Sequence, residues 1–156
     1  MKSNRRFHAA AITLVEVMVA IGLFGITAAA AVEALVRMNL NAALCRLQTG
    51  ASTLAQNQID LILSDAPFNP QYSQIPPELT IGTTNTGSST APTLAVYTDP
   101  VTNQKVLGWM TTVVADTGST ENGNTMYVYQ VSVTVSYYYK GRLYSVAMST
   151  MRCSDT

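Results

Sequence analysis

Charged residues are scarce in this chain of 156 residues: they make up 12 % of it, about half of the usual globular share. Nine bases balance nine acids, and no basic patch suggests binding to nucleic acid. The one histidine, His8, excludes a multi-histidine metal site. The two cysteines, Cys45 and Cys153, have no metal-ligand spacing, so we expect no metal site.

Residues 9–36 form a long apolar run, and one acid, Glu16, lies near its start. About 20 apolar residues cross a bilayer core as a helix. A carboxylate in hydrocarbon costs about 2.5–3.5 kcal/mol on insertion scales, so it usually marks a pairing or functional site. Lys2, Arg5 and Arg6 precede the run without an acid, whereas the rest of the chain carries six bases and nine acids. The positive-inside rule therefore predicts a cytoplasmic N-terminus and export of the residues after about 36.

Two simple interpretations explain part of this pattern. A secretory signal peptide would use the basic start and a cleavage site at residues 28–30, three alanines. However, the apolar run is longer than the usual 7–15 residues of such signals, and it contains an acid. A plain single-span anchor explains the length and the flanking charges, but it leaves Glu16 without a purpose.

Residues 11–20, AITLVEVMVA, resemble the start of type IV pilins and type II secretion pseudopilins. In that family a short basic leader ends at a small residue, and a membrane peptidase cuts there and methylates the new amine. The fifth residue after the cut is glutamate. Aligning on Glu16 places the cut between Ala11 and Ile12, where the family usually has glycine before the cut and phenylalanine or methionine after it. The resemblance implies that Ile12 is N-methylated, and that Glu16 directs assembly by neutralising the Ile12 amine of a neighbouring subunit.

The resemblance also implies a function. The chain would be a structural subunit of a type IV pilus-like filament or secretion pseudopilus, stored in the bacterial inner membrane and later part of a periplasmic or extracellular filament. Its partners would be copies of itself or sibling pilins, the prepilin peptidase and an assembly platform. The alternative is a single-span, membrane-anchored surface binding module that does not polymerise. Because His8 would leave with the leader, no histidine-based triad is available, and we expect neither enzyme activity nor a cofactor.

The helical pattern continues beyond the membrane. Apolar residues recur every three, four or seven positions, which predicts a helix with one apolar face ending before Pro67: Leu40, Leu44, Leu47, Ala51, Leu54, Ile59, Leu61, Ile62 and Leu63. We therefore divide the chain into a leader (1–11), a transmembrane half of the helix (12–36), an amphipathic half (37–66), a loop region (67–93) and a head (94–156). The predicted fold class is α+β, the pilin fold, with a long N-terminal helix packed against an antiparallel sheet of about four strands.

Four strands are predicted in the head, over residues 93–98, 105–115, 126–139 and 142–151, with a polar loop at 116–125. The last two alternate apolar and polar residues around a two-residue turn, Lys140-Gly141. This turn predicts a register that pairs Tyr137 with Tyr144, Val135 with Val146, Val133 with Met148, Ser136 with Ser145 and Ser132 with Ser149. Trp109 is expected in the core. Cys45 on the helix and Cys153 after the last strand are either a disulfide or two separate buried thiols.

Overall fold

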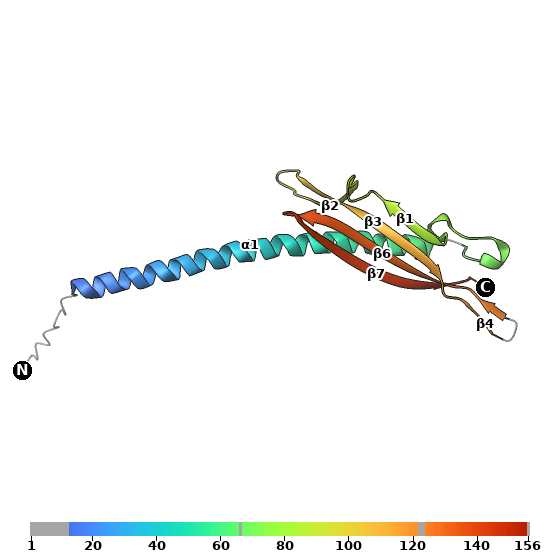
Figure 1. The fold of residues 1–156 in the computed structure, drawn as a ribbon, viewed down its shortest axis with the longest axis horizontal. Coiled ribbons are helices and arrows are strands. Elements are labelled where there is room, and N and C mark those ends of the chain that lie inside the picture. Colours follow the sequence, from blue (N-terminus) through green and yellow to red (C-terminus); the bar gives the residue numbers. More distant parts are fainter. Residues whose placement is uncertain (1–12, 66, 122–123, 156) are drawn as a thin grey trace, which may run out of the picture. The chain divides into compact units, whose positions relative to one another are not determined.

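The computed structural model describes residues 13–65, 67–121 and 124–155. One helix, α1 (Leu14–Ser64), is followed by two short 3₁₀ helices, η1 (Pro70–Tyr72) and η2 (Pro77–Leu79). Seven strands then complete the described chain (Figure 1): β1 (Gly82–Thr86), β2 (Leu94–Thr98), β3 (Lys105–Asp116), β4 (Ser119–Glu121), β5 (Asn124–Met126), β6 (Val128–Tyr139) and β7 (Arg142–Cys153). The chain forms two compact units, of which the first ends at Ala43 and the second, the head, begins at Leu44. The predicted α+β class is confirmed.

The head contains a five-stranded antiparallel sheet in the order β1-β3-β6-β7, with β2 also paired to β3 (Figure 1). β1 pairs with residues 110–114 of β3, and β2 pairs with residues 105–108, so the two short strands share one side of β3. β4 and β5 form a separate two-stranded ribbon. β7 and the β1/β2 pair are therefore the two edges of the main sheet.

The predicted register of the β6–β7 hairpin is confirmed at every pair. Tyr137 lies opposite Tyr144, Val135 opposite Val146 and Ser136 opposite Ser145, and the pairing runs without a shift along both strands. Lys140 and Gly141 have φ angles of 49° and 76°. Positive φ at both central residues is typical of a type I′ turn, whose twist matches that of the strands that it joins.

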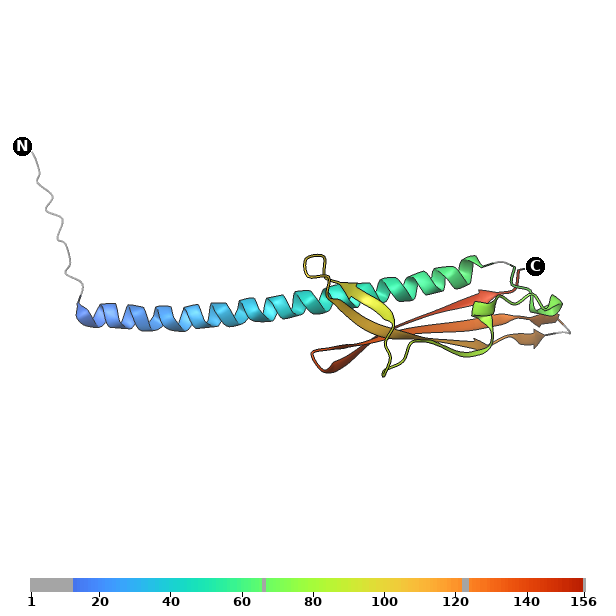
Figure 2. The ribbon, with the colours of Figure 1, turned by 90° about the horizontal axis from the view of Figure 1, so that it is seen from above.

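The core of the head lies between one face of α1 and the inner face of the sheet (Figure 2). Valines and tyrosines of β6 supply most of the sheet side, as the alternation predicted. The helix side differs from the predicted apolar face. Leu61 and Leu63 are 48 % and 44 % exposed, and Ala55, which was not predicted to lie on that face, is fully buried. The buried helix positions follow a spacing of four and then three: Leu47, Ala51, Ala55, Ile59 and Ile62.

Gly50 explains how β2 reaches the helix. A Cβ atom at Gly50 would overlap the backbone carbonyl oxygen of Val96, in the middle of β2. Only a residue without a side chain permits this approach. Glycine lowers the helix propensity at this position, but it permits a close contact between α1 and the sheet edge.

Three expectations about the head were wrong in detail. The predicted loop 67–93 contains β1, whose sequence GTTNT is exposed at all five positions and so has no apolar alternation to reveal it. The predicted polar loop 116–125 contains β4 and the start of β5. Trp109 lies on the outer face beside Tyr138, with ring centroids 5.6 Å apart, because its neighbour Met110 and Thr112 take the inward positions of β3.

The end of β7 and the residues that follow it are attached to the end of α1. The buried guanidinium of Arg152 donates a hydrogen bond to the carbonyl of Ile62 in the last turn of the helix. It also pairs with Asp155 at 3.3 Å and lies 5.5 Å from the ring centre of Phe68. The Asp155 carboxylate accepts the backbone N–H of Phe68 at 2.9 Å, and the Asp155 N–H donates to the Phe68 carbonyl at 2.7 Å. We call Arg152, Asp155, Ile62 and Phe68 the C-terminal clasp.

Candidate functional site

The candidate site lies in the first turns of α1, where Thr13 caps the helix. The backbone N–H of Glu16 donates to the hydroxyl of Thr13 at 3.3 Å and to its carbonyl at 3.1 Å. A threonine followed three residues later by glutamate has the spacing of a capping box. The spacing of Thr13 and Glu16 is visible in the sequence and marks the start of the helix. The capped first turn also suits an acid, because the positive end of the helix dipole favours a carboxylate.

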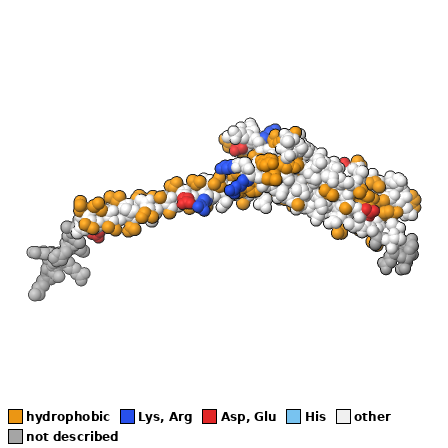
Figure 3. Space-filling view, in the orientation of Figure 1, with side chains coloured by type: hydrophobic (Ala, Val, Ile, Leu, Met, Phe, Trp, Pro, Cys, Tyr) orange, Lys and Arg blue, Asp and Glu red, His pale blue; other side chains and the backbone are white. Residues whose placement is uncertain are grey.

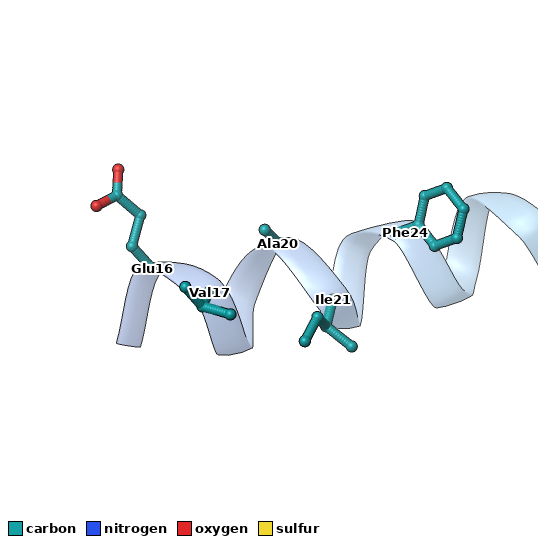
Figure 4. A pocket seen from close by; sticks show the side chains of 5 residues that line it. All are labelled: Glu16, Val17, Ala20, Ile21 and Phe24. Carbon is teal, nitrogen blue, oxygen red and sulfur yellow. The ribbon is translucent and has the colours of Figure 1, made fainter. Parts of the chain in front are cut away.

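Glu16 stands out from an apolar surface. Figure 4 shows Glu16, Ala20 and Phe24 along one side of the helix, with Val17 and Ile21 beside them. These five residues line an open hollow of about 520 Å³, in which the small Ala20 separates the carboxylate from the aromatic ring. Among residues 13–65, 67–121 and 124–155, no cation forms an ion pair with Glu16. An acid in this setting has no partner within its own described chain.

Glu33, the second acid of the first unit, has a different environment. Its carboxylate pairs with Arg37 four residues later at 2.6 Å, and both side chains are largely exposed. An exposed pair of this kind contributes about 0.3–0.5 kcal/mol. Glu33 therefore resembles an ordinary surface residue, whereas Glu16 does not.

The helix that carries Glu16 is long and apolar enough to cross a membrane, and none of its most apolar stretch is buried within the described protein. Hydrophobic side chains cover much of the visible surface of this first unit (Figure 3). Exposed apolar surface on this scale marks a membrane or a protein interaction site. The helix is thus suited to hydrocarbon, or to other helices that replace it.

Residues 6–32 match the family model described as a prokaryotic N-terminal methylation motif. The chain carries the prepilin signature of type IV pilins and pseudopilins. The predicted cut between Ala11 and Ile12 falls inside the matched residues, but both residues lie outside those that the structure describes. The prepilin signature implies processing by a prepilin peptidase and, in general, assembly with other pilins. Comparisons with curated proteins and with solved structures each found no match.

The other candidates from the sequence lie in the head, and the structure does not bring them together. Cys45 and Cys153 are both free and exposed. Leu44 lines a cavity with Tyr144, near the turn that starts β7, whereas Arg152 contacts the last turn of α1. The two cysteines therefore lie at opposite ends of the layer formed by α1 and β7, and a disulfide requires Cα atoms within about 7 Å. Within the described residues, no group of three or more His, Cys, Asp or Glu side chains could hold a metal.

Proposed function

We propose that this prepilin-like chain is a structural subunit of a type IV pilus-like filament or secretion pseudopilus. It is stored in the bacterial inner membrane with its N-terminus in the cytoplasm, cleaved between Ala11 and Ile12, and methylated on the Ile12 amine before it enters the filament. The observation that carries the proposal is the prepilin signature, placed on an uncovered apolar helix with an acid that has no partner in the described chain. The proposal assigns the protein no catalytic role and no cofactor.

Glu16 provides the specificity of assembly in this proposal. Cleavage gives Ile12 a positive amine, four residues before Glu16 in the same apolar surroundings. A buried charge without a partner is strongly unfavourable, so a pair between Glu16 of one subunit and the Ile12 amine of the next fixes their axial register. The side chain of Ala20, next to Glu16 on the same side of the helix, is small and would let a neighbouring helix approach closely here.

A pair of matched variants tests the role of Glu16. Glu16→Gln removes the negative charge and keeps the size of the side chain, and Glu33→Gln does the same at the exposed, paired acid. Because breaking a buried ion pair costs about 3–5 kcal/mol, we expect Glu16→Gln to lower incorporation into filaments by at least about tenfold. Glu33→Gln should assemble like the wild-type chain. Equal incorporation of the two variants would contradict the assembly role.

Mass spectrometry of the mature N-terminus tests the processing. A methylated Ile12 supports the proposal, because the prokaryotic N-terminal methylation motif predicts this modification at the cut. An intact Met1 would instead favour the membrane-anchored binding module, and a start near Ala31 would indicate a secretory signal peptide.

A further inference from the structure

β7 leaves a long row of backbone groups without partners. Its first residue, Arg142, closes the hairpin opposite Tyr139, and beyond its end the N–H of Ser154 donates to the carbonyl of Tyr127. In an antiparallel ladder, alternate residues bond to the neighbouring strand, so the even-numbered residues of β7 bond to β6. The N–H and C=O groups of the odd-numbered residues point away from β6, and no other described strand pairs with them.

Within the part of the chain that the structure describes, the middle of this edge lacks the devices that usually prevent pairing with another chain. Between Arg142 and Arg152 the sequence LYSVAMSTM contains no charge, proline or glycine. The register with β6 continues through all twelve residues without a bulge. Natural proteins protect such edges with lysine, proline, bulges or a covering element, because a flat, uncharged edge is a template for a further strand.

The opposite edge of the same sheet has matching properties. All five residues of β1 are exposed, and none is charged. β1 is antiparallel to β3, β3 to β6 and β6 to β7, so β1 and β7 run in opposite directions. When two copies point the same way, β7 of one copy can therefore meet β1 of the next as an antiparallel strand.

We propose that β1 of a second copy of this chain adds to the free edge of β7 and extends the sheet from subunit to subunit. The proposal depends on the proposed function only in that the copies lie parallel. Contact between two β7 strands would be isologous and would end at two copies. Contact between β7 and β1 leaves a free edge at each end, so it continues along an assembly of any length.

The strand pairings within one head indicate which residues would meet. Asn85 pairs with Thr111, Thr111 with Thr134, and Thr134 with Ala147, so Asn85 and Ala147 lie at the same level of the sheet. At zero axial offset, Asn85 of the second copy would face Ala147, and Thr83 would face Ser149. These two pairs would form about four backbone hydrogen bonds. A pair between Glu16 and the Ile12 amine of the next subunit requires an offset of about 6 Å. This offset shifts the register by two residues and places Asn85 opposite Ser145 or Ser149.

A cavity between β7 and α1 can receive a side chain of the added strand. It measures about 220 Å³, and its lining comes from both elements and from β6: Leu44, Gln48, Tyr137, Tyr144, Ser145 and Val146. In the register at zero axial offset, Thr86 of the second copy would face Val146 on the inner side of the sheet, beside the Gln48 amide. Strand addition commonly combines backbone bonds for affinity with side-chain pockets for specificity.

Cysteine cross-linking of the full-length chain in membranes and filaments tests this contact. In a background with Cys45→Ser and Cys153→Ser, Asn85→Cys is combined in turn with Ser145→Cys, Ala147→Cys and Ser149→Cys, which covers neighbouring registers. β1 and β7 are separated by two strands within one chain, so any disulfide between them joins two copies. Asn85→Cys with Thr134→Cys is the matched control, because Thr134 lies on the same face of a central strand. At least one edge pair should give roughly tenfold more cross-linked dimers and multimers than the control, since a disulfide needs Cα atoms within about 7 Å.

Each outcome separates this contact from the filament function. Filaments without cross-links at any edge pair, or with equal cross-linking of the control, would overturn the strand addition and leave the proposed function standing. Cross-links in membranes that contain no filaments would support the strand addition and count against the filament. If neither filaments nor edge cross-links form, both proposals fail. A second variant, Ala147→Pro, removes an N–H that points away from β6. It should reduce the cross-links of Asn85→Cys with Ser145→Cys or Ser149→Cys without lowering the melting temperature substantially.

Discussion

The C-terminal clasp should contribute a large share of the stability of the head, and Arg152→Met measures that share. Methionine keeps most of the apolar stem of arginine but removes the guanidinium, which is buried and donates to the Ile62 carbonyl. The substitution therefore removes one partner of several interactions and leaves the other partners in place. Removing only the donor lowers the stability more than removing both partners would, because the Ile62 carbonyl stays buried without a hydrogen bond.

The expected magnitude follows from the three contacts of the guanidinium. Its hydrogen bond to the helix carbonyl contributes about 1.5–3 kcal/mol, as bonds with a charged donor do. Its position over the Phe68 ring adds about 0.5–1 kcal/mol. The pair with Asp155 adds little, since that carboxylate is 56 % exposed. Relief from burying a charge offsets part of this sum, so we expect a net loss of about 2 kcal/mol, or roughly 8 °C in melting temperature for a head of this size.

Thermal unfolding of the full chain in detergent, followed by near-ultraviolet circular dichroism of the head tyrosines, measures the effect. Arg142→Met is the matched control, because Arg142 is exposed at the other end of the same strand. A surface substitution of this kind should change the stability by no more than about 0.5 kcal/mol. If the two variants unfolded within about 2 °C of each other, the clasp would contribute nothing measurable, and the reasoning from its contacts would be refuted.

The remaining predictions concern the clasp carboxylate, the close contact at Gly50 and the cysteines. Hydrogen bonding from the Phe68 N–H, with Arg152 acting in the same direction, holds the pKa of Asp155 below its ordinary value. As the pH falls, the unfolded chain therefore takes up this proton first. The contribution of Asp155 to the free energy of unfolding is present above about pH 4 and is lost as the pH falls through the lower pKa of the folded state. Asp155→Asn should make the free energy of unfolding less dependent on pH below about pH 4, and an unchanged acid unfolding curve would contradict this role of Asp155. Gly50→Ala should lower the free energy of unfolding by about 1–2 kcal/mol, because the added Cβ would overlap the Val96 carbonyl. This loss is expected although alanine improves the helix propensity by about 1 kcal/mol. The control Gly25→Ala, which meets no atom within 4 Å, should not destabilise the chain, and equal effects in chemical denaturation would exclude the overlap. A thiol titration of the non-reduced protein should find both Cys45 and Cys153 reactive, whereas no reactive thiol would indicate a bridge.

The hairpin shows why part of the fold was predictable from the sequence. Its register depends on two local features, a two-residue turn with glycine at Gly141 and a strict alternation on both strands. A slip by one residue would have put valines opposite serines, so the pattern permitted only one pairing. The start of α1 was equally local, since a threonine cap, an acid and an apolar run lie within a few residues of one another.

The parts that were missed depend on contacts between distant segments. β1 is recognisable only from its pairing with β3, because its own residues are small, polar and exposed. Because Leu61 and Leu63 are leucines, the pattern predicts that they face the sheet, whereas they are exposed and the small Ala51 and Ala55 are fully buried. From the sequence alone, Arg152 looks like a solvent-exposed residue after the predicted strand 142–151. Its contact with the end of α1 depends on the tertiary fold.

The long sequence separations in the clasp have a consequence for the order of folding. The contact between Arg152 and Ile62 joins residues 90 positions apart, whereas the β6–β7 hairpin closes through a two-residue turn. Loop closure costs more entropy for distant partners, so we expect the hairpin to form early and the clasp to close last. In that sequence Arg152→Met should accelerate unfolding and leave the refolding rate nearly unchanged, and a matching loss in refolding rate would show the opposite order. The clasp would then form after the rest of the head has folded, and its main effect would be to slow unfolding at the end of α1.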